Sequence, residues 1–267
     1  MRSYATSVVE LRADCARCAG LCCVIPALTR TADFALDKPA GEPCPNLRDD
    51  FRCGIHSRLR SSGFPGCTVY DCFGAGQQVV QVTFGGTLSP AVRDDMFAAF
   101  GVLRPLHEVL WHLEFAQRLE AAAPVRPALT EQIVQVTALV AGSPAVLAAV
   151  DVGEVRSAAG PLLREASRLA RAGTPARDLR GADLMGKRLR GASLRGADLG
   201  GAYVIGADLR GADLDRADVI GADFRGADVR GANLSTTLYL TQPQVNAANG
   251  DAATRLPPGA DRPPHWD

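Results

Sequence analysis

The feature that most constrains this chain is a five-residue repeat, which fills the segment from about 177 to 235. Most units read Ala-Asp-Leu-x-Gly, with the large apolar residue at the centre. The centres are Leu179, Leu184, Leu189, Leu194, Leu199, Val204, Leu209, Leu214, Val219, Phe224, Val229 and Leu234. A period of five matches neither the 3.6-residue period of a helix nor the alternation of a strand. It predicts a solenoid, in which each unit buries its apolar side by stacking on its neighbours.

The repeat resembles the pentapeptide-repeat family, whose members wind into a right-handed four-sided β-helix with four units per turn. The resemblance implies twenty-residue coils, in which Leu179 lies under Leu199 and Val219, and a stack of about three coils. Alanine two residues before most centres suits a narrow interior, and glycine two residues after a centre suits a tight corner. Arg177 and Lys187 take the alanine position in the first coil. We expect that coil to be frayed or adapted to a neighbour.

The eight cysteines all precede residue 73, well before the repeat: Cys15, Cys18, Cys22, Cys23, Cys44, Cys53, Cys67 and Cys72. Close pairs of cysteines separated by loops bring several thiolates to one point, as Zn²⁺ or an iron–sulfur cluster requires. The many glycines and prolines between them predict loops with little apolar core, so a metal would supply folding free energy. The alternative is a set of buried reduced thiols, for which the adjacent pair Cys22-Cys23 is a poor pattern.

This cysteine-rich head, over about residues 12–73, resembles the CxxCxxxCC family of zinc- or iron-chelating domains. The matching segments are Cys15 to Cys23, Cys44-Pro45-Asn46-Leu47, Cys53-Gly54-Ile55-His56 and Gly66-Cys67-Thr68-Val69-Tyr70. The resemblance implies that the cysteines bind metal. Cys72 goes beyond the shared pattern, so the eight thiols could fill two sites of four or one cluster with spares. His56 could be a ligand, although we favour a packed ring. Sulfur ligands limit the cofactor to a zinc ion or an iron–sulfur cluster and do not separate the two.

The middle of the chain shows apolar residues at helical spacing. We expect a long helix over 90–123, weakened at Gly101 and Pro105. Shorter helices should follow over 129–141, 144–150 and 152–172, the last of them covering the N-terminal end of the solenoid. His107 and His112 are five residues apart and so do not share a helix face as the two histidines of HExxH do. We interpret them as surface or core residues.

These observations predict a multi-module α+β protein in four parts. They are a loop-rich, metal-bound cysteine head over 1–87, a small helical module over 88–173, a short right-handed quadrilateral β-helix over 174–240, and a C-terminal capping helix with a proline-rich tail over 241–267. Thr241 and Gln244 form a capping-box signature, which predicts a helix over about 242–249. The isolated Trp266 either anchors the tail to the body of the protein or binds a partner, and we favour the anchor.

The charges balance, with 29 basic and 29 acidic residues, so the composition gives no sign of a nucleic-acid partner. No apolar run approaches the ~20 residues of a transmembrane helix, and the N-terminus shows no secretory signal. We therefore expect a cytoplasmic protein that binds neither nucleic acid nor membrane, in which disulfides are not expected.

The favoured function is that of a metal-binding repeat protein that acts as a protein-interaction scaffold or regulator, with an unknown protein partner or a second copy of itself. The sequence contains no nucleophile–base pair, phosphate loop or carboxylate dyad, which favours a non-enzymatic protein. An iron–sulfur or metal-dependent redox or modifying enzyme is the first alternative, because such a centre shows none of those signatures. The second is a gyrase-binding mimic of DNA. The nearly neutral charge and shortness of the repeat argue against it.

The outer surface of the repeat offers a further hypothesis. Stacking by twenty residues places Arg190, Arg210 and Arg230 in one outward column, with Asp208 and Asp228 close enough to pair with them. A solvated face of paired charges is favoured. The alternative is a site for an acidic partner, since stacked guanidinium groups repel unless anions intervene. Met185, Ile205 and Ile220 form a second outward group that could seal against another surface.

Overall fold

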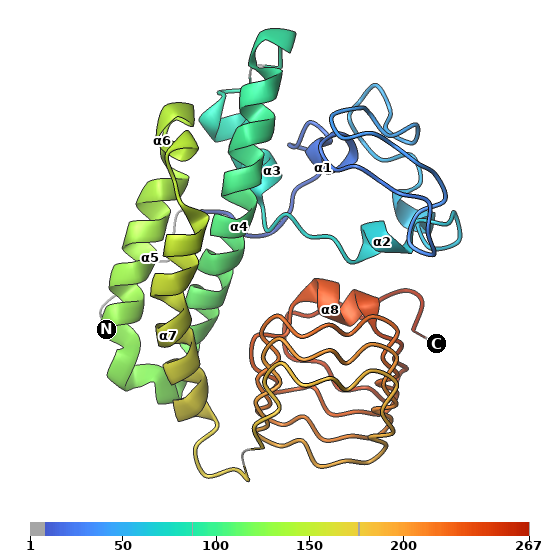
Figure 1. Cartoon of the computed structure of the whole chain (residues 1–267), viewed down its shortest axis with the longest axis vertical. Helices are drawn as coiled ribbons and strands as arrows, with labels where there is room; N and C mark the ends of the chain where they lie inside the picture. The colour runs from blue at the N-terminus through green and yellow to red at the C-terminus, as the bar shows by residue number, and fades with distance from the viewer. Residues whose placement is uncertain (1–8, 87, 176, 267) are drawn as a thin grey trace. The chain divides into compact units, whose positions relative to one another are not determined.

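A computed structural model describes residues 9–86, 88–175 and 177–266. The chain divides into two compact units. One holds the chain up to Arg118 together with Ala123–Arg164, and the other holds Leu119–Ala122 with the chain from Glu165 onward. Figure 1 shows short helices and loops followed by longer helices in the first unit, and a stack of coils in the second.

The cysteine-rich head is built from loops, as its glycine and proline content predicts. Its regular elements are α1 (Leu21–Val24), the 3₁₀ turn η1 (His56–Arg58), α2 (Pro65–Thr68), α3 (Ala75–Gln77) and the π-helical turn η2 (Gln78–Thr83). Isolated antiparallel bridges join Leu28 to Lys38 and Leu47 to Cys53. One apolar cluster among its loops has three buried residues, Ile55, Leu59 and Phe64. Leu21 and Phe73 are buried as well, but the apolar core of these loops is small, which leaves much of their stability to other interactions.

Two glutamines join the start of the head to its end. The buried side chain of Gln77 donates to the Arg12 carbonyl at 2.7 Å and accepts from the Asp14 N–H at 3.1 Å. Gln81 donates to the Arg17 carbonyl at 2.9 Å. These bonds span more than sixty residues of sequence and hold the segment around Cys15 and Cys18 beside the segment that follows Cys72.

The helical part begins with the 3₁₀ turn η3 (Pro90–Val92) and ends within the second unit. Its elements are α4 (Arg93–Arg118), η4 (Glu120–Val125), α5 (Arg126–Val140), α6 (Pro144–Ala148) and α7 (Val152–Ala170). The predicted long helix therefore ends at Arg118, five residues early. It also continues through Pro105, which leaves the Gly101 carbonyl without its N–H donor. Gly101 is exposed, so water can bond that carbonyl.

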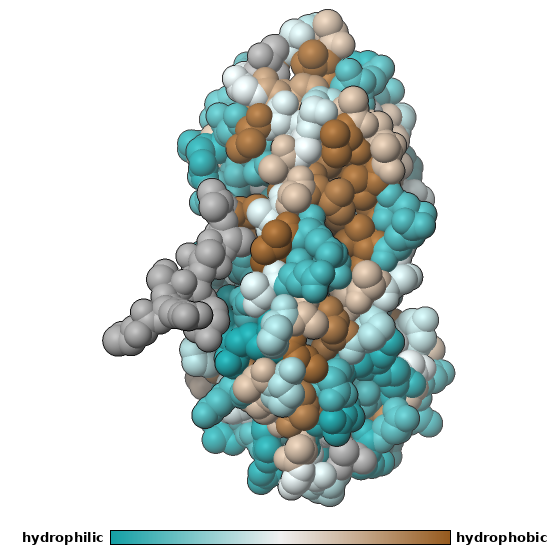
Figure 2. Space-filling model, turned by 90° about the vertical axis from the view of Figure 1, so that its left-hand side faces the viewer, coloured by the Kyte–Doolittle hydropathy of each residue, from teal (hydrophilic) through white to brown (hydrophobic). Residues whose placement is uncertain are grey.

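Figure 2 shows apolar residues gathered over one face of the structure. Val134 on α5 and Val146 on α6 are among the exposed large apolar side chains, at 63% and 47% exposure. None of the described helices is both long enough and apolar enough to cross a membrane.

The repeat forms the predicted four-sided solenoid. Parallel bridges join residues twenty apart, from Asp178 with Asp198 to Asp213 with Asn233. Each bridge is a single residue long, so the coils pair at points rather than along strands. The corners need a left-handed backbone: Gly206 has φ 62°, and Arg216, where the sequence lacks the usual glycine, still has φ 53°.

The interior of the solenoid is closely filled from Leu194, the last centre of the first coil, upward. The centres from Leu194 to Leu234 and the alanines from Ala197 to Ala232 are at most 4% exposed. The first-coil centres Leu179, Leu184 and Leu189 are only partly buried. Arg177 and Lys187 are exposed. The described residues of the first coil nevertheless keep the bridges and the left-handed glycine corners of the other coils, so the expected fraying is not seen there.

The stack continues beyond the predicted boundary at residue 240. Bridges join Asp218 to Leu238, Asp228 to Asn249 and Asn233 to Arg255, which adds a fourth, partial layer to the three predicted. The spacing there grows from twenty residues to twenty-one across α8 (Gln242–Ala247), and to twenty-two across the turn at Asp251 and Thr254 that follows it. Val245 belongs to the solenoid core, as a capping helix requires.

The predicted capping box and tail anchor are both confirmed. Thr241 and Gln244 exchange hydrogen bonds at the start of α8. The Trp266 side chain is 6% exposed, and its indole N–H donates to the Ala248 carbonyl at 2.9 Å. The proline-rich tail therefore closes the C-terminal end of the solenoid.

The end of α7 does not cover the N-terminal end of the solenoid, contrary to the prediction. It contacts the side of the coils instead. Ser167 donates to the buried Asp218 carboxylate at 2.5 Å, and Arg171 bonds the Gly196 carbonyl and pairs with Asp198 at 3.3 Å. Polar partners on the coil surface, which periodicity alone cannot reveal, position this helix end.

Burial raises the pKa of Asp218, because desolvation disfavours the charged carboxylate more in the folded unit than in the unfolded chain. Stability from this group is present at low pH and is lost as pH rises from about 4 through the raised pKa. Relative to wild type, Asp218→Asn should therefore become progressively more stable as pH rises from 4 to 7, in urea unfolding of the solenoid. A relative loss of stability for the variant over this range would contradict the prediction.

Candidate metal centre

All eight cysteines predicted as metal ligands are free thiols in the structure. Their mutual electrostatic interactions fall largely into two groups, although Cys23 also interacts with Cys15 and Cys22. We call Cys15, Cys18, Cys22 and Cys72 the first thiol set. We call Cys23, Cys44, Cys53 and Cys67 the second thiol set. From the sequence it was open whether the thiols form two groups of four, and the group to which Cys72 belongs was not predicted.

In the first thiol set, backbone N–H groups point at sulfur. Burial raises the pKa of Cys18 to about 11, and the thiols of Cys72 and Cys15 add to the rise, while the N–H groups of Leu21 and Gly20 oppose it. Burial also raises the pKa of Cys72, against hydrogen bonds from two backbone N–H groups in the turn that follows it. An N–H donor stabilises a thiolate, which is the form that binds metal.

Glycine at position 76 lets the backbone approach these sulfurs. A Cβ there would lie 2.6 Å from the Cys18 sulfur and 3.8 Å from the Cys72 sulfur. The side chain of any other residue would therefore enter the space between two members of the first thiol set.

The second thiol set lies beside a buried lysine that the sequence analysis missed. Lys38 is 4% exposed and donates to the carbonyls of Val24, Pro39 and Glu42 at 2.7–2.9 Å. Its ammonium group contributes to lowering the pKa of Cys23. Composition could have drawn attention to this residue, because Lys38 is one of only two lysines in a chain rich in arginine. Asn46 adds a donor to the Cys44 sulfur at 3.8 Å.

The two thiol sets meet at Cys22 and Cys23 on α1. The Cys22 thiol donates a hydrogen bond to Cys23, which raises the pKa of Cys22 and lowers that of Cys23. Burial of Cys67 raises its pKa to about 11, with Cys23, Cys53 and Cys44 contributing. Each set thus contains thiols whose ionisation is costly without a cation.

The donor atoms fit zinc or an iron–sulfur cluster, because both take four thiolates and N–H···S bonds orient such ligands. Among the residues described, however, no three His, Cys, Asp or Glu side chains have the spacing of a closed metal site. The thiols are gathered but not arranged around one point. His56 is exposed on η1, so its predicted packed ring is wrong.

Helix α4 holds the backbone on either side of Cys72. Arg104 donates to the Asp71 carbonyl at 3.2 Å, and His107 Nδ1 donates to the Phe73 carbonyl at 2.7 Å. Burial lowers the pKa of His107 and of His112 to about 4, so both are neutral core residues near pH 7. The first thiol set is therefore fixed to the helices through one of its members.

On the solenoid, the predicted arginine column alternates with carboxylates. Arg210 pairs with Asp208 at 2.6 Å and with Asp228 at 3.6 Å, and Arg230 pairs with Asp228 at 2.5 Å. The hydrogen bonds from Arg210 lower the pKa of Asp208 to about 2. This part of the column matches the favoured expectation of a solvated face with paired charges.

Comparisons with known proteins match either the repeat alone or nearly the whole chain. A family model described as Pentapeptide repeats matches residues 178–211 and 205–237. Over 265 residues the chain is 48% identical to "Uncharacterized protein YybG" of Bacillus subtilis (strain 168), covering 96% of this chain and 95% of that one.

Solved structures resemble a smaller part of the chain. A pentapeptide repeat protein, Rfr23, from the cyanobacterium Cyanothece 51142 is 30% identical over 34% of this chain, with a TM-score of 0.24. One from the Arabidopsis thaliana thylakoid lumen is 31% identical over 32% of it, with a TM-score of 0.25. This chain spans about half the length of each.

Proposed function

From the premise that this chain belongs to the pentapeptide-repeat family, we propose that it is a non-enzymatic binding protein with a metal-stabilised head. In this proposal the two thiol sets hold metal, and the solenoid presents a surface to a protein partner. The observation that carries the metal part is the gathering of eight thiols into two sets of four within a head that has little apolar core.

A bound metal would neutralise the thiolates and cross-link segments that are distant in sequence. In the first thiol set it would join residues 15–22 to Cys72. In the second it would join Cys23 to Cys44, Cys53 and Cys67. The chain supplies the rest: backbone N–H groups orient Cys18 and Cys72, and the Lys38 ammonium offsets negative charge beside the second set.

If each thiol set binds its own metal, substituting a cysteine of one set should remove only the metal bound by that set. Cys72→Ser should remove about half of the bound metal, Cys67→Ser the other half, and the double variant nearly all of it. The reason is that each residue belongs to a different thiol set. The measurement is zinc, iron and acid-labile sulfide per chain in protein purified without oxygen.

His56→Ala is the matched control, because this exposed side chain belongs to neither thiol set and should leave the metal content unchanged. Complete loss of metal in each single variant would indicate one shared centre. A metal-free wild-type protein would overturn the metal part of the proposal. Iron with stoichiometric sulfide would shift the function towards the redox alternative, whereas zinc alone would support a structural head.

A further inference from the structure

The solenoid's charge is unevenly divided between its coils. The first coil, residues 177–197, has six cations and two anions: Arg177, Arg180, Lys187, Arg188, Arg190, Arg195, Asp178 and Asp183. The next two coils, residues 198–237, have seven aspartates and four arginines. The near neutrality of the repeat therefore conceals a strongly cationic first coil.

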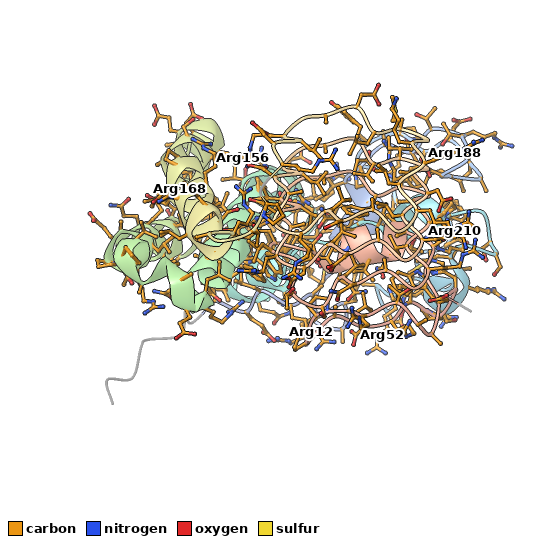
Figure 3. The ribbon with its side chains drawn as sticks, turned by 90° about the horizontal axis from the view of Figure 1, so that it is seen from below. Arg12, Arg52, Arg156, Arg168, Arg188 and Arg210 are labelled. Atoms are coloured by element: carbon orange, nitrogen blue, oxygen red, sulfur yellow. The ribbon has the colours of Figure 1, made fainter. Side chains whose placement is uncertain are left out.

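The first-coil cations are only partly compensated. Arg180 pairs with Asp198 at 2.9 Å and Arg195 with Asp215 at 3.0 Å, both in the second coil. Within the described parts of the chain, the other four cations make no ion pair: Arg177, Lys187, Arg188 and Arg190. Figure 3, which views the structure from below, shows Arg188 on the same side of the coils as Arg210.

The first coil also has an unused backbone edge. In the second coil, the Asp198 N–H donates to the Arg177 carbonyl, and the Asp198 carbonyl accepts from the Leu179 N–H, both at 2.8 Å. The corresponding backbone N–H and C=O groups of the first coil belong to Asp178, Asp183, Arg188 and Ser193, and they face away from the stack. Among the described residues, no backbone hydrogen bond is made to these groups. Such an edge can add an extended chain.

Apolar side chains and cations lie together at this edge. Leu179, Leu184 and Leu189 are partly buried, whereas the centres above them are almost completely buried. Arg177 and Lys187 occupy the inward position on opposite sides of the four-sided coil, since they are ten residues apart. A terminal repeat with this composition lacks the polar or covering cap that solenoids require.

We propose that the open first coil is a docking end for an acidic, extended segment of a partner protein. The segment would hydrogen-bond to the unused backbone groups, cover the leucines with its own apolar residues, and pair its carboxylates with the four cations that make no ion pair among the described residues. This inference rests on the proposed role of the solenoid as an interaction surface and is independent of the metal.

Two other occupants fit the observations less well. A second copy docked end to end would bring two cationic coils together, which like-charge repulsion opposes. A nucleic acid would satisfy the cations, but it has no peptide backbone to continue the ladder and would leave the leucines uncovered. An acidic polypeptide satisfies all three features at once.

The test uses the full-length protein and a fluorescein-labelled peptide that alternates Glu and Val, with binding followed by anisotropy. Arg177→Ala with Lys187→Ala should weaken binding about tenfold, as expected for the loss of two charge contacts. Alanine is the residue that most other units carry at this position, so the fold should persist. Arg210→Ala with Arg230→Ala is the matched control and should change affinity less than about twofold, because Asp208 and Asp228 already pair with these arginines.

The proposal is overturned if wild type does not bind the peptide, or if the two double variants weaken binding equally or not at all. Preferred binding of duplex DNA, or loss of the open edge in a dimer of the free protein, would also overturn it. Metal content measured on the same samples separates the two proposals. A metal-free protein that still binds the peptide at the first coil would contradict the metal-stabilised head alone.

Discussion

Removing metal from the head is expected to unfold residues 1–85 and to leave the solenoid folded. Chelation, or Cys15→Ala with Cys18→Ala, should therefore expose the head to limited proteolysis while the solenoid remains resistant. The physical reason is that the apolar cluster among the head's loops has only three buried residues, and its other buried apolar residues, such as Leu21 and Phe73, are few, whereas the solenoid has its own extensive core. Because Arg104 and His107 hold the backbone around Cys72, cleavage should extend from the head towards α4.

The control for this experiment is the metal-loaded wild-type protein under the same protease treatment. A second measurement, differential scanning calorimetry, should show one transition that depends on metal and one that does not. A single cooperative loss of both parts on chelation would show that the division between head and solenoid is wrong.

The second large effect is expected at the opposite end of the chain. Trp266→Ala should destabilise the solenoid unit by about 3–5 kcal/mol, the usual cost of truncating a buried large aromatic residue. The ring lies so close to Gly250 that a Cβ there would come within 2.4 Å of it, and its N–H bonds the Ala248 carbonyl. Urea unfolding followed by circular dichroism measures the change.

Tyr203→Ala is the matched control, because this aromatic side chain on the coils is 52% exposed and its loss should cost no more than about 0.5 kcal/mol. Equal effects of the two substitutions would mean that the tail does not cap the solenoid. A loss in the Trp266 variant alone would establish the tail as part of the folded unit.

The fold of the repeat was predictable because the position of each unit in the sequence determines which units it stacks on. The position of Leu194 in the sequence determines that Leu214 lies above it, and both are at most 1% exposed. The fourth layer was missed because α8 interrupts the period, so Asn249 and Arg255 pair at distances in sequence that no repeat count gives. Local periodicity predicts a solenoid until an insertion breaks it.

The cysteines were predictable as candidate ligands, but their grouping was not. Cys22 and Cys23 are neighbours in sequence and belong to different thiol sets, while Cys72 joins residues fifty or more positions away. Which thiols meet depends on bonds such as those of Gln77, whose partners lie far from it in sequence. Spacing identifies the chemistry, and long-range packing decides the partners.

The single-residue bridges and twenty-residue period of the solenoid have a consequence for its length. Because each coil repeats the same four corners and contacts only the coils above and below it, the stack can grow or shrink by one whole coil. The first coil and the α8–Trp266 cap would keep their structures, while the separation between them would change by one layer. A protein built in this way can alter the distance between its two ends in fixed increments without redesigning either end.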